Sequence, residues 1–301
     1  MIRRGFLSVA AALALSACAS APVEAQAPSA GGFVSERIIV TTQGEGPDVI
    51  VIPGLTSSAE IWDTTAAALD DNHRVHLVQL NGFAGHPARA NLEGAVSAPA
   101  AEEIARYIRE TGLDHPAVIG HSMGGTIGMM LTARHPDQVG RLMVVDMIPF
   151  MGVIFGGADA TPESIAPVAA QIRAAMAGAP QGIVSPQTRQ AIDNMVRTES
   201  ARPRLIEHAR GSDNRVTANA YYELLTTDLR PELAAITQPF TVLYVVPPNA
   251  PVSAEQYSGY VTASYANAPN AKIVHIEESY HFIMIDQFDR FMREVNAFLA
   301  E

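Results

Sequence analysis

The order of apolar and polar positions predicts strands that alternate with helices through most of the chain. Short runs rich in valine, isoleucine and leucine are expected to form strands at Arg37–Thr42, Asp48–Ile52, Arg74–Leu80, Ala117–Ile119, Arg141–Val145, Phe240–Val246 and Lys272–Ile276. Helical periodicity between them predicts helices at Ile61–Leu69, Ala98–Glu110, Thr126–Arg134 and Phe288–Leu299. Such alternation is typical of an α/β fold, in which helices cover both faces of a mainly parallel sheet.

The alternation lapses from Pro149 to about Leu233, where helical patterns dominate. We interpret this stretch as a helical lid, at about residues 147–235, inserted into a single domain that spans residues 33–301. A segment of this length fits one large α/β domain with an insertion better than two independent domains.

The amino terminus has the pattern of an export signal. Arg3 and Arg4 give it a positive start, and the apolar stretch Phe6–Leu15 is too short to span a bilayer permanently. The following Leu15-Ser16-Ala17-Cys18 resembles the bacterial lipobox, in which cleavage precedes a cysteine that becomes lipidated, and Cys18 is the only cysteine. We therefore expect residues 1–17 to be a lipoprotein signal peptide and Cys18 to carry the lipid.

Residues 18–32 are mostly alanine, proline, serine and glycine, which predicts a flexible tether between a lipid anchor and the folded domain. Ser20 stands where an aspartate often retains lipoproteins at the inner membrane, so this pattern favours the outer membrane of the cell envelope. The alternative is an ordinary secretory signal, cut for example after Ala27, which gives a periplasmic or secreted protein.

The charge balance argues against nucleic acid as a partner. Acidic residues outnumber basic ones 31 to 20, the net charge is −11, and Lys272 is the only lysine. The histidines are scattered, no His-Glu-x-x-His motif occurs and no glycine-rich dinucleotide fingerprint follows a strand, so we expect neither a metal nor another cofactor.

The most informative motif is Gly120-His121-Ser122-Met123-Gly124, a G-x-S-x-G pentapeptide between an apolar strand and a helical segment. A serine at such a turn is held in a strained conformation, and small residues two positions before and after it let the backbones approach closely. The turn exposes the hydroxyl at a helix amino terminus, where developing negative charge is stabilised. Ser122 is thus the candidate nucleophile, and His121 is expected to pack beside it.

At this motif the chain resembles the α/β-hydrolase superfamily, and the resemblance extends over essentially all of Ser35–Glu301. It implies that His281, in a short loop after the last strand, is the general base. It also implies an oxyanion hole made by the backbone N–H groups of Met123 and Leu55, the latter because Pro53-Gly54-Leu55 resembles the family's His-Gly-x turn.

The acid of the triad has two candidate positions in the sequence. Many relatives carry it after the strand assigned here to Phe240–Val246, yet the following loop has no carboxylate before Glu255. Asp146 ends the strand that follows the nucleophile helix, a second position known in the superfamily, and the order Ser122, Asp146, His281 matches the family order. We therefore predict Asp146 as the acid, with Glu255 as the alternative.

These residues predict a cofactor-free serine hydrolase that cleaves carboxylic esters through an acyl-enzyme. The apolar side chains at the start of the lid, in Met147–Met151, Ile154 and Phe155, suit esters of modest size and apolar character. The same superfamily also supplies lyases, C–C bond hydrolases and perhydrolases. A non-catalytic binding protein with this fold is the alternative from another class. Oligomeric state does not follow from the sequence.

Overall fold

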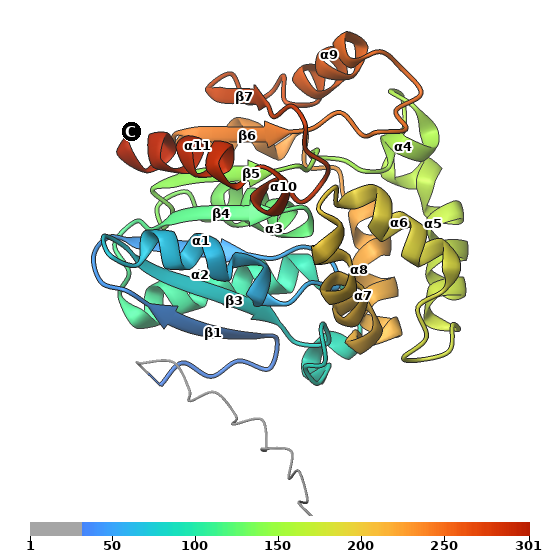
Figure 1. The fold of residues 1–301 in the computed structure, drawn as a ribbon, viewed down its shortest axis with the longest axis horizontal. Helices are drawn as coiled ribbons and strands as arrows, with labels where there is room; N and C mark the ends of the chain where they lie inside the picture. Colours follow the sequence, from blue (N-terminus) through green and yellow to red (C-terminus); the bar gives the residue numbers. More distant parts are fainter. Residues whose placement is uncertain (1–31) are drawn as a thin grey trace, which may run out of the picture.

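The computed structural model describes residues 32–301, and it contains one seven-stranded sheet with the order β1-β3-β2-β4-β5-β6-β7 (Figure 1). The strands are β1 (Ile38–Gln43), β2 (Asp48–Ile52), β3 (Arg74–Leu80), β4 (Ala117–His121), β5 (Arg141–Val145), β6 (Phe240–Tyr244) and β7 (Ala271–His275). All neighbours pair in parallel except β1, which runs antiparallel to β3 at one edge. This confirms the α/β fold, and the parallel register brings the carboxyl ends of β4, β5 and β6 to the same edge.

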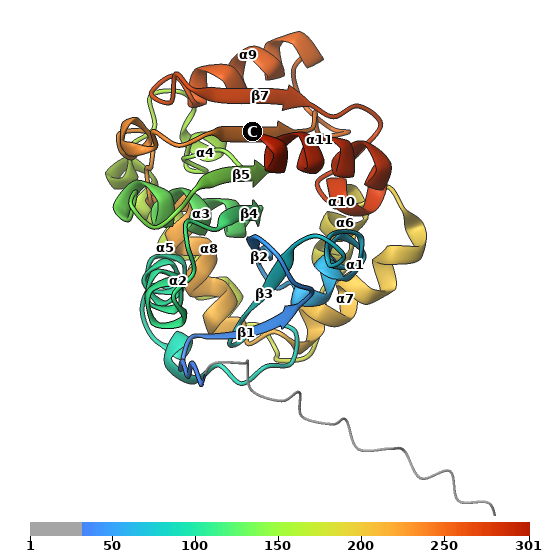
Figure 2. The same ribbon diagram turned by 90° about the vertical axis from the view of Figure 1, so that its left-hand side faces the viewer.

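Helices cover the two faces of the sheet because alternate strand residues point to opposite sides. Val49 and Val51 pack in the cluster that includes α1 (Asp63–Leu69) and α11 (Phe288–Ala300), whereas Ile50 and Ile52 pack in the cluster that includes α2 and α3. The second face carries α2 (Ser97–Thr111), α3 (Met123–Arg134) and α9 (Ala254–Ser264). Figure 2 shows these helices on opposite sides of the strands.

A helical insertion, which we define as residues 147–235, connects β5 to β6 and lies beyond the carboxyl ends of the strands (Figure 1). Its α-helices are α4 (Val153–Gly156), α5 (Pro162–Ala177), α6 (Pro186–Met195), α7 (Arg202–Gly211) and α8 (Asn214–Thr226). Phe150, Ile165 and Leu225 belong to a small apolar cluster of its own, separate from the two clusters on the sheet. The Leu229 N–H donates to the Pro149 carbonyl at 3.0 Å and joins the two ends of the insertion.

Helix α8 is fixed to the sheet domain through a buried carboxylate. Glu223, only 7% exposed, accepts hydrogen bonds from the backbone N–H groups of Val96 (2.8 Å), Ser97 (2.6 Å) and Ala98 (2.8 Å). These groups form the amino end of α2, where N–H groups have no partner within the helix and where negative charge is favourable. An acidic side chain of the insertion therefore caps a helix of the core.

The predicted elements are present, with shifts at their ends that have local causes. β4 runs to His121 and α3 begins at once with Met123, so Ser122 is the only residue between them. β6 ends at Tyr244 because the N–H of the next residue, Val245, donates to the side chain of Asp146 at 3.0 Å. The predicted signal peptide, the tether and Cys18 lie outside the described residues. Within residues 32–301, no helix is both long and apolar enough to cross a bilayer.

Candidate active site

The turn between β4 and α3 holds Ser122 in a backbone conformation that few non-glycine residues adopt. Its φ is 54° and its ψ is −122°. A Cβ on Gly120 would collide with the backbone of Gly124, and a Cβ on Gly124 would collide with the backbone of Ile52. The two glycines are therefore required by close approach, as the motif predicted, and the serine is presented at the first turn of a helix.

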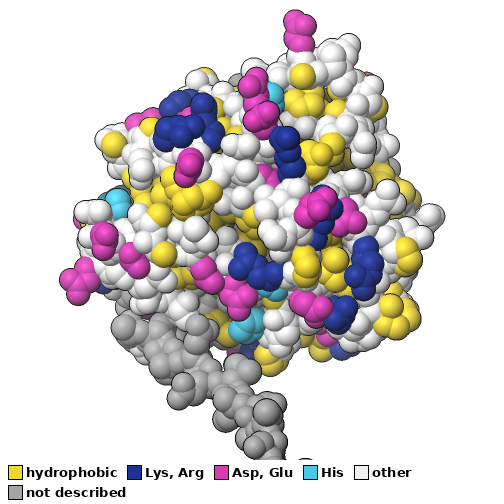
Figure 3. Space-filling model, viewed as in Figure 1, with side chains coloured by type: hydrophobic (Ala, Val, Ile, Leu, Met, Phe, Trp, Pro, Cys, Tyr) yellow, Lys and Arg dark blue, Asp and Glu magenta, His cyan; other side chains and the backbone are white. Residues whose placement is uncertain are grey.

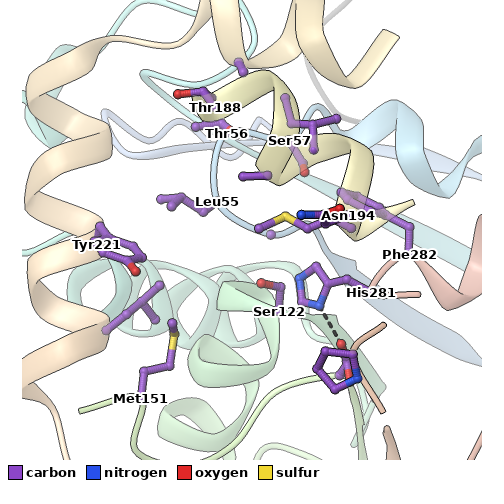
Figure 4. A pocket seen from close by; sticks show the side chains of 18 of the residues that line it. Leu55, Thr56, Ser57, Ser122, Met151, Thr188, Asn194, Tyr221, His281 and Phe282 are labelled. Atoms are coloured by element: carbon purple, nitrogen blue, oxygen red, sulfur yellow. Dashed lines mark hydrogen bonds and ion pairs between the residues drawn. The ribbon is translucent and has the colours of Figure 1, made fainter. Parts of the chain in front are cut away.

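His281 and Asp146 meet at the same edge of the sheet. The Asp146 carboxylate accepts a hydrogen bond from His281 Nδ1 at 2.6 Å, and its other oxygen accepts one from the Val245 N–H at 3.0 Å. A carboxylate can only accept, so the proton is on Nδ1 and Nε2 of a neutral His281 is free to receive another. Ser122 and His281 line the same pocket, and in the view of Figure 4 their side chains are drawn close to each other.

The alternative acid lies elsewhere. Glu255 is in the first turn of α9 and is exposed, whereas Asp146, at the end of β5, is the carboxylate that contacts His281. Asp146 also has a positive φ of 52°, and its own N–H donates to the Leu243 carbonyl at 2.7 Å. Its backbone is thus turned away from the strand direction so that the side chain reaches His281.

His121 is buried beside these residues and contacts the base directly. Its Nε2 lies 3.0 Å from the His281 carbonyl oxygen, and the two ring centres are 4.5 Å apart. Burial, reinforced by the proximity of His281, lowers the pKa of His121 well below its usual value. His121 is therefore neutral with its proton on Nε2. The sequence placed it beside the nucleophile but gave no sign of this contact.

The two predicted oxyanion donors lie on turns that flank Ser122. Met123 is the first residue of α3, where an N–H has no partner within the helix. Leu55 follows Gly54, and a Cβ on Gly54 would lie 2.9 Å from the Ser122 Cβ, so this turn packs against the nucleophile. Among residues 32–301, neither N–H has a hydrogen-bond acceptor.

Ser122 and His281 open into a cavity of about 700 Å³ between the sheet edge and the insertion. Most of its wall is apolar, and the contributing side chains include Leu55, Met147, Ile148, Met151, Ile154, Met176, Ile183, Ile192, Leu224 and Phe282. Asp146 is the only acidic residue in the lining, which contains no arginine or lysine. The cavity therefore suits an uncharged, largely apolar ligand.

The wall also has a polar side. Thr56 and Ser57 come from the loop after β2, and Thr188 and Asn194 come from α6. In the view of Figure 4, Thr188, Thr56 and Ser57 lie to one side of Ser122, while Tyr221 and Met151 lie to the other. A ligand bound across Ser122 thus contacts small polar side chains on one side and larger, more apolar side chains on the other.

The face of the molecule seen in Figure 3 is not marked by one sign of charge. On the face seen in Figure 3, lysine and arginine side chains are dispersed among aspartates and glutamates. Ile154 and Ile183, which line the cavity, are 64% and 68% exposed, and Met195 of α6 is 41% exposed. The mouth therefore has an apolar rim.

The fold and the serine at its strand–helix turn define the class of α/β hydrolases. Residues 47–288 match the family model described as alpha/beta hydrolase fold, and the chain belongs to this family.

Relatives and solved structures agree with this membership. The pimeloyl-[acyl-carrier protein] methyl ester esterase of Aliivibrio fischeri (strain MJ11) is 24% identical over 267 residues, covering 86% of this chain and 96% of the relative. The Vibrio cholerae protein of the same name is 27% identical, covering 86% and 93%. The enol-lactonase from Burkholderia xenovorans LB400 superposes with a TM-score of 0.67 at 19% identity, covering 88% and 96%. A thermophilic esterase from Thermogutta terrifontis gives 0.68 at 18%, covering 87% and 93%.

Proposed function

We propose that this protein is a serine hydrolase that cleaves carboxylic esters with Ser122, His281 and Asp146 as its triad. The observation that carries the proposal is the 2.6 Å hydrogen bond from His281 Nδ1 to Asp146, because it leaves Nε2 free beside Ser122 at the floor of the cavity. The esterase names of several relatives support the same reaction class.

In the proposed reaction, His281 Nε2 takes the Ser122 hydroxyl proton while Oγ attacks the ester carbonyl carbon. The carbonyl oxygen becomes an oxyanion, which the N–H groups of Leu55 and Met123 stabilise. The alcohol leaves with the proton from His281, and the acyl group stays on Ser122. Water then loses a proton to His281, attacks the acyl carbon and releases the carboxylic acid, and the proton returns to Ser122.

The substrate class follows from the cavity. Its apolar wall and the lack of arginine and lysine in the lining favour esters with an uncharged acyl group, because a carboxylate placed there loses hydration without gaining a cationic partner. The cavity of about 700 Å³ accommodates esters of modest size.

Covalent labelling with a fluorophosphonate, followed by an aryl ester series of increasing acyl length, tests the proposal. We expect stoichiometric labelling and steady-state ester turnover. Labelling without ester turnover would favour a lyase, a C–C bond hydrolase or a perhydrolase, and no labelling would favour a non-catalytic binding protein.

We further propose that Cys18 is lipidated and anchors the mature protein in the cell envelope, with the outer membrane favoured. The motive is the sequence Leu15-Ser16-Ala17-Cys18 in a chain with no other cysteine. Mass spectrometry of the mature protein should find an acylated Cys18 at the amino terminus. An unmodified terminus beyond that residue would instead indicate a secreted or periplasmic protein.

A further inference from the structure

The carboxylate of Asp286 joins two segments that are far apart in the sequence. Asp286 ends the short helix α10 (Ile283–Asp286), just after His281. It accepts hydrogen bonds from the backbone N–H groups of Arg197 (2.9 Å) and Thr198 (2.8 Å), which belong to the insertion between α6 and α7. It accepts a third from the N–H of Tyr280 (3.0 Å), the residue before His281. We call these four residues the Asp286 clamp.

Two more contacts connect the same segments. The N–H of Phe282, the residue after His281, donates to the Met195 carbonyl at 3.2 Å. The Arg197 guanidinium donates to the Glu278 carbonyl at 2.9 Å. The backbone on both sides of His281 is therefore held by the insertion.

The loop that carries His281 needs such support. Glu278 has a positive φ of 55°, a conformation that costs free energy for a non-glycine residue and persists only when surrounding contacts impose it. Hydrogen bonds from N–H groups to an ionised carboxylate are about twice as strong as neutral ones, and Asp286 accepts three of them.

The segment held by the clamp is continuous with a wall of the cavity. Asn194 and Met195 line the cavity at the end of α6, and only Val196 separates them from Arg197. The Asp286 carboxylate, together with these two contacts, thus connects the loop of the base to the wall that a substrate touches.

We propose that Asp286 is a positioning residue: through the Asp286 clamp it holds His281 in its reactive place and ties that place to the α6 wall of the cavity. This inference rests on the proposed function, because it assigns a role in the reaction of His281. Placement errors of about 1 Å in a catalytic group can lower the rate 100-fold, so loss of the clamp is expected to act on kcat.

The test compares Asp286→Asn with Asp289→Asn, which removes an exposed carboxylate of α11 outside the clamp. We expect Asp286→Asn to lower kcat about 10- to 100-fold, to slow acylation and deacylation together in pre-steady-state measurements, and to change KM little. Asp289→Asn should match the wild type. A merely structural role would lower Tm and leave kcat unchanged, and a role confined to the cavity wall would raise KM alone; either result would overturn the proposal.

Asp286→Glu, which displaces the carboxylate by one methylene group, replaces Asp286→Asn should that variant not fold. Arg197→Ala separates the guanidinium contact from the clamp. It removes the guanidinium contact with Glu278 at the surface and leaves the carboxylate in place, and Arg189→Ala on the exposed face of α6 is its control. We expect a smaller loss of kcat for Arg197→Ala than for Asp286→Asn, because the backbone N–H at position 197 still donates to Asp286. A loss as large as that of Asp286→Asn would assign the positioning to the guanidinium contact and would overturn the proposal.

Hydrogen–deuterium exchange separates failure of the clamp from failure of the proposed function. Asp286→Asn, or Asp286→Glu in its place, should increase exchange in residues 195–198 and 277–282 together, whether or not the wild type turns over esters. Unchanged exchange in either segment would overturn the clamp. An inactive wild type that still shows the coupled increase would overturn the proposed function, and with it the role of Asp286 in catalysis, while the structural link remains.

Discussion

Asp146 lies at the end of β5 and accepts a hydrogen bond of 2.6 Å from His281, whereas Glu255 is exposed on α9. We expect Asp146→Asn to lower kcat on the order of 10⁴-fold, because an amide no longer fixes the imidazole tautomer that leaves Nε2 free. Glu255→Gln should stay close to wild type. Steady-state kinetics on one aryl ester measures both, and a large loss in Glu255→Gln with little in Asp146→Asn would reverse the assignment.

Ser122→Ala should abolish fluorophosphonate labelling and lower kcat by roughly 10³-fold or more, since the acyl-enzyme can no longer form. The circular dichroism spectrum and Tm should remain near those of the wild type, because the hydroxyl makes no hydrogen bond within the described residues that the fold requires. Full labelling of Ser122→Ala would place the nucleophile at another residue.

Met151→Trp should restrict the cavity to esters with shorter acyl groups. Met151 lines the apolar side of the cavity, and a larger ring there removes space for a long chain. We expect kcat/KM for long acyl esters to fall at least about 10-fold, with little change for an acetate. Phe155→Trp adds bulk to the neighbouring helix α4 outside the lining and serves as the control. An equal loss for acetate and long esters would contradict this role.

Stability should fall as the pH drops below about 6.5. Burial lowers the pKa values of His76, His121 and His208, so these residues bind protons less readily in the folded protein than in the unfolded chain. As the pH falls, the unfolded chain therefore binds protons before the folded protein does. The free energy of unfolding decreases over the pH range between the pKa values of these histidines in the unfolded chain and their lower values in the folded protein. Urea denaturation at pH 7.5 and 5.5 measures the effect.

We expect His208→Gln to make this pH effect smaller, with His115→Gln at an exposed histidine as the control. A urea midpoint that is equal or higher at pH 5.5 than at pH 7.5 would show that these histidines do not determine how stability changes over this pH range.

Glu223→Gln should lower the free energy of unfolding by about 1–3 kcal/mol, because the capping carboxylate loses the charge that α2 stabilises. Glu45→Gln removes an exposed carboxylate and controls for the change in net charge. Chemical denaturation measures both variants. No difference between them would mean that the buried contact adds nothing to stability.

Features encoded in short stretches could be predicted from the sequence. The strands, the turn at Ser122 and the helices α2 and α11 each follow from a local pattern, and the parallel order of strand ends explains why Asp146 and His281 could be expected to meet.

Contacts between distant segments could not be predicted. His121 and the carbonyl of His281 are 160 positions apart, and Asp286 meets the insertion across 88 and 89 positions. Nearly every residue has a backbone N–H, so the sequence does not indicate which of these groups a carboxylate will bind. Glu223 and Asp286 therefore could not be distinguished from other acidic residues of helices.

The cap that Glu223 places on α2 limits how the insertion can be exchanged. A chimera that replaces residues 147–235 by the corresponding segment of a relative would remove Glu223, and it would uncover the amino end of α2 unless the donor supplies an acceptor at the same place. Grafts confined to α4, α5 and α6 preserve that acceptor and still replace much of the cavity wall. The part of the insertion suited to engineering new substrate preferences therefore ends before α7.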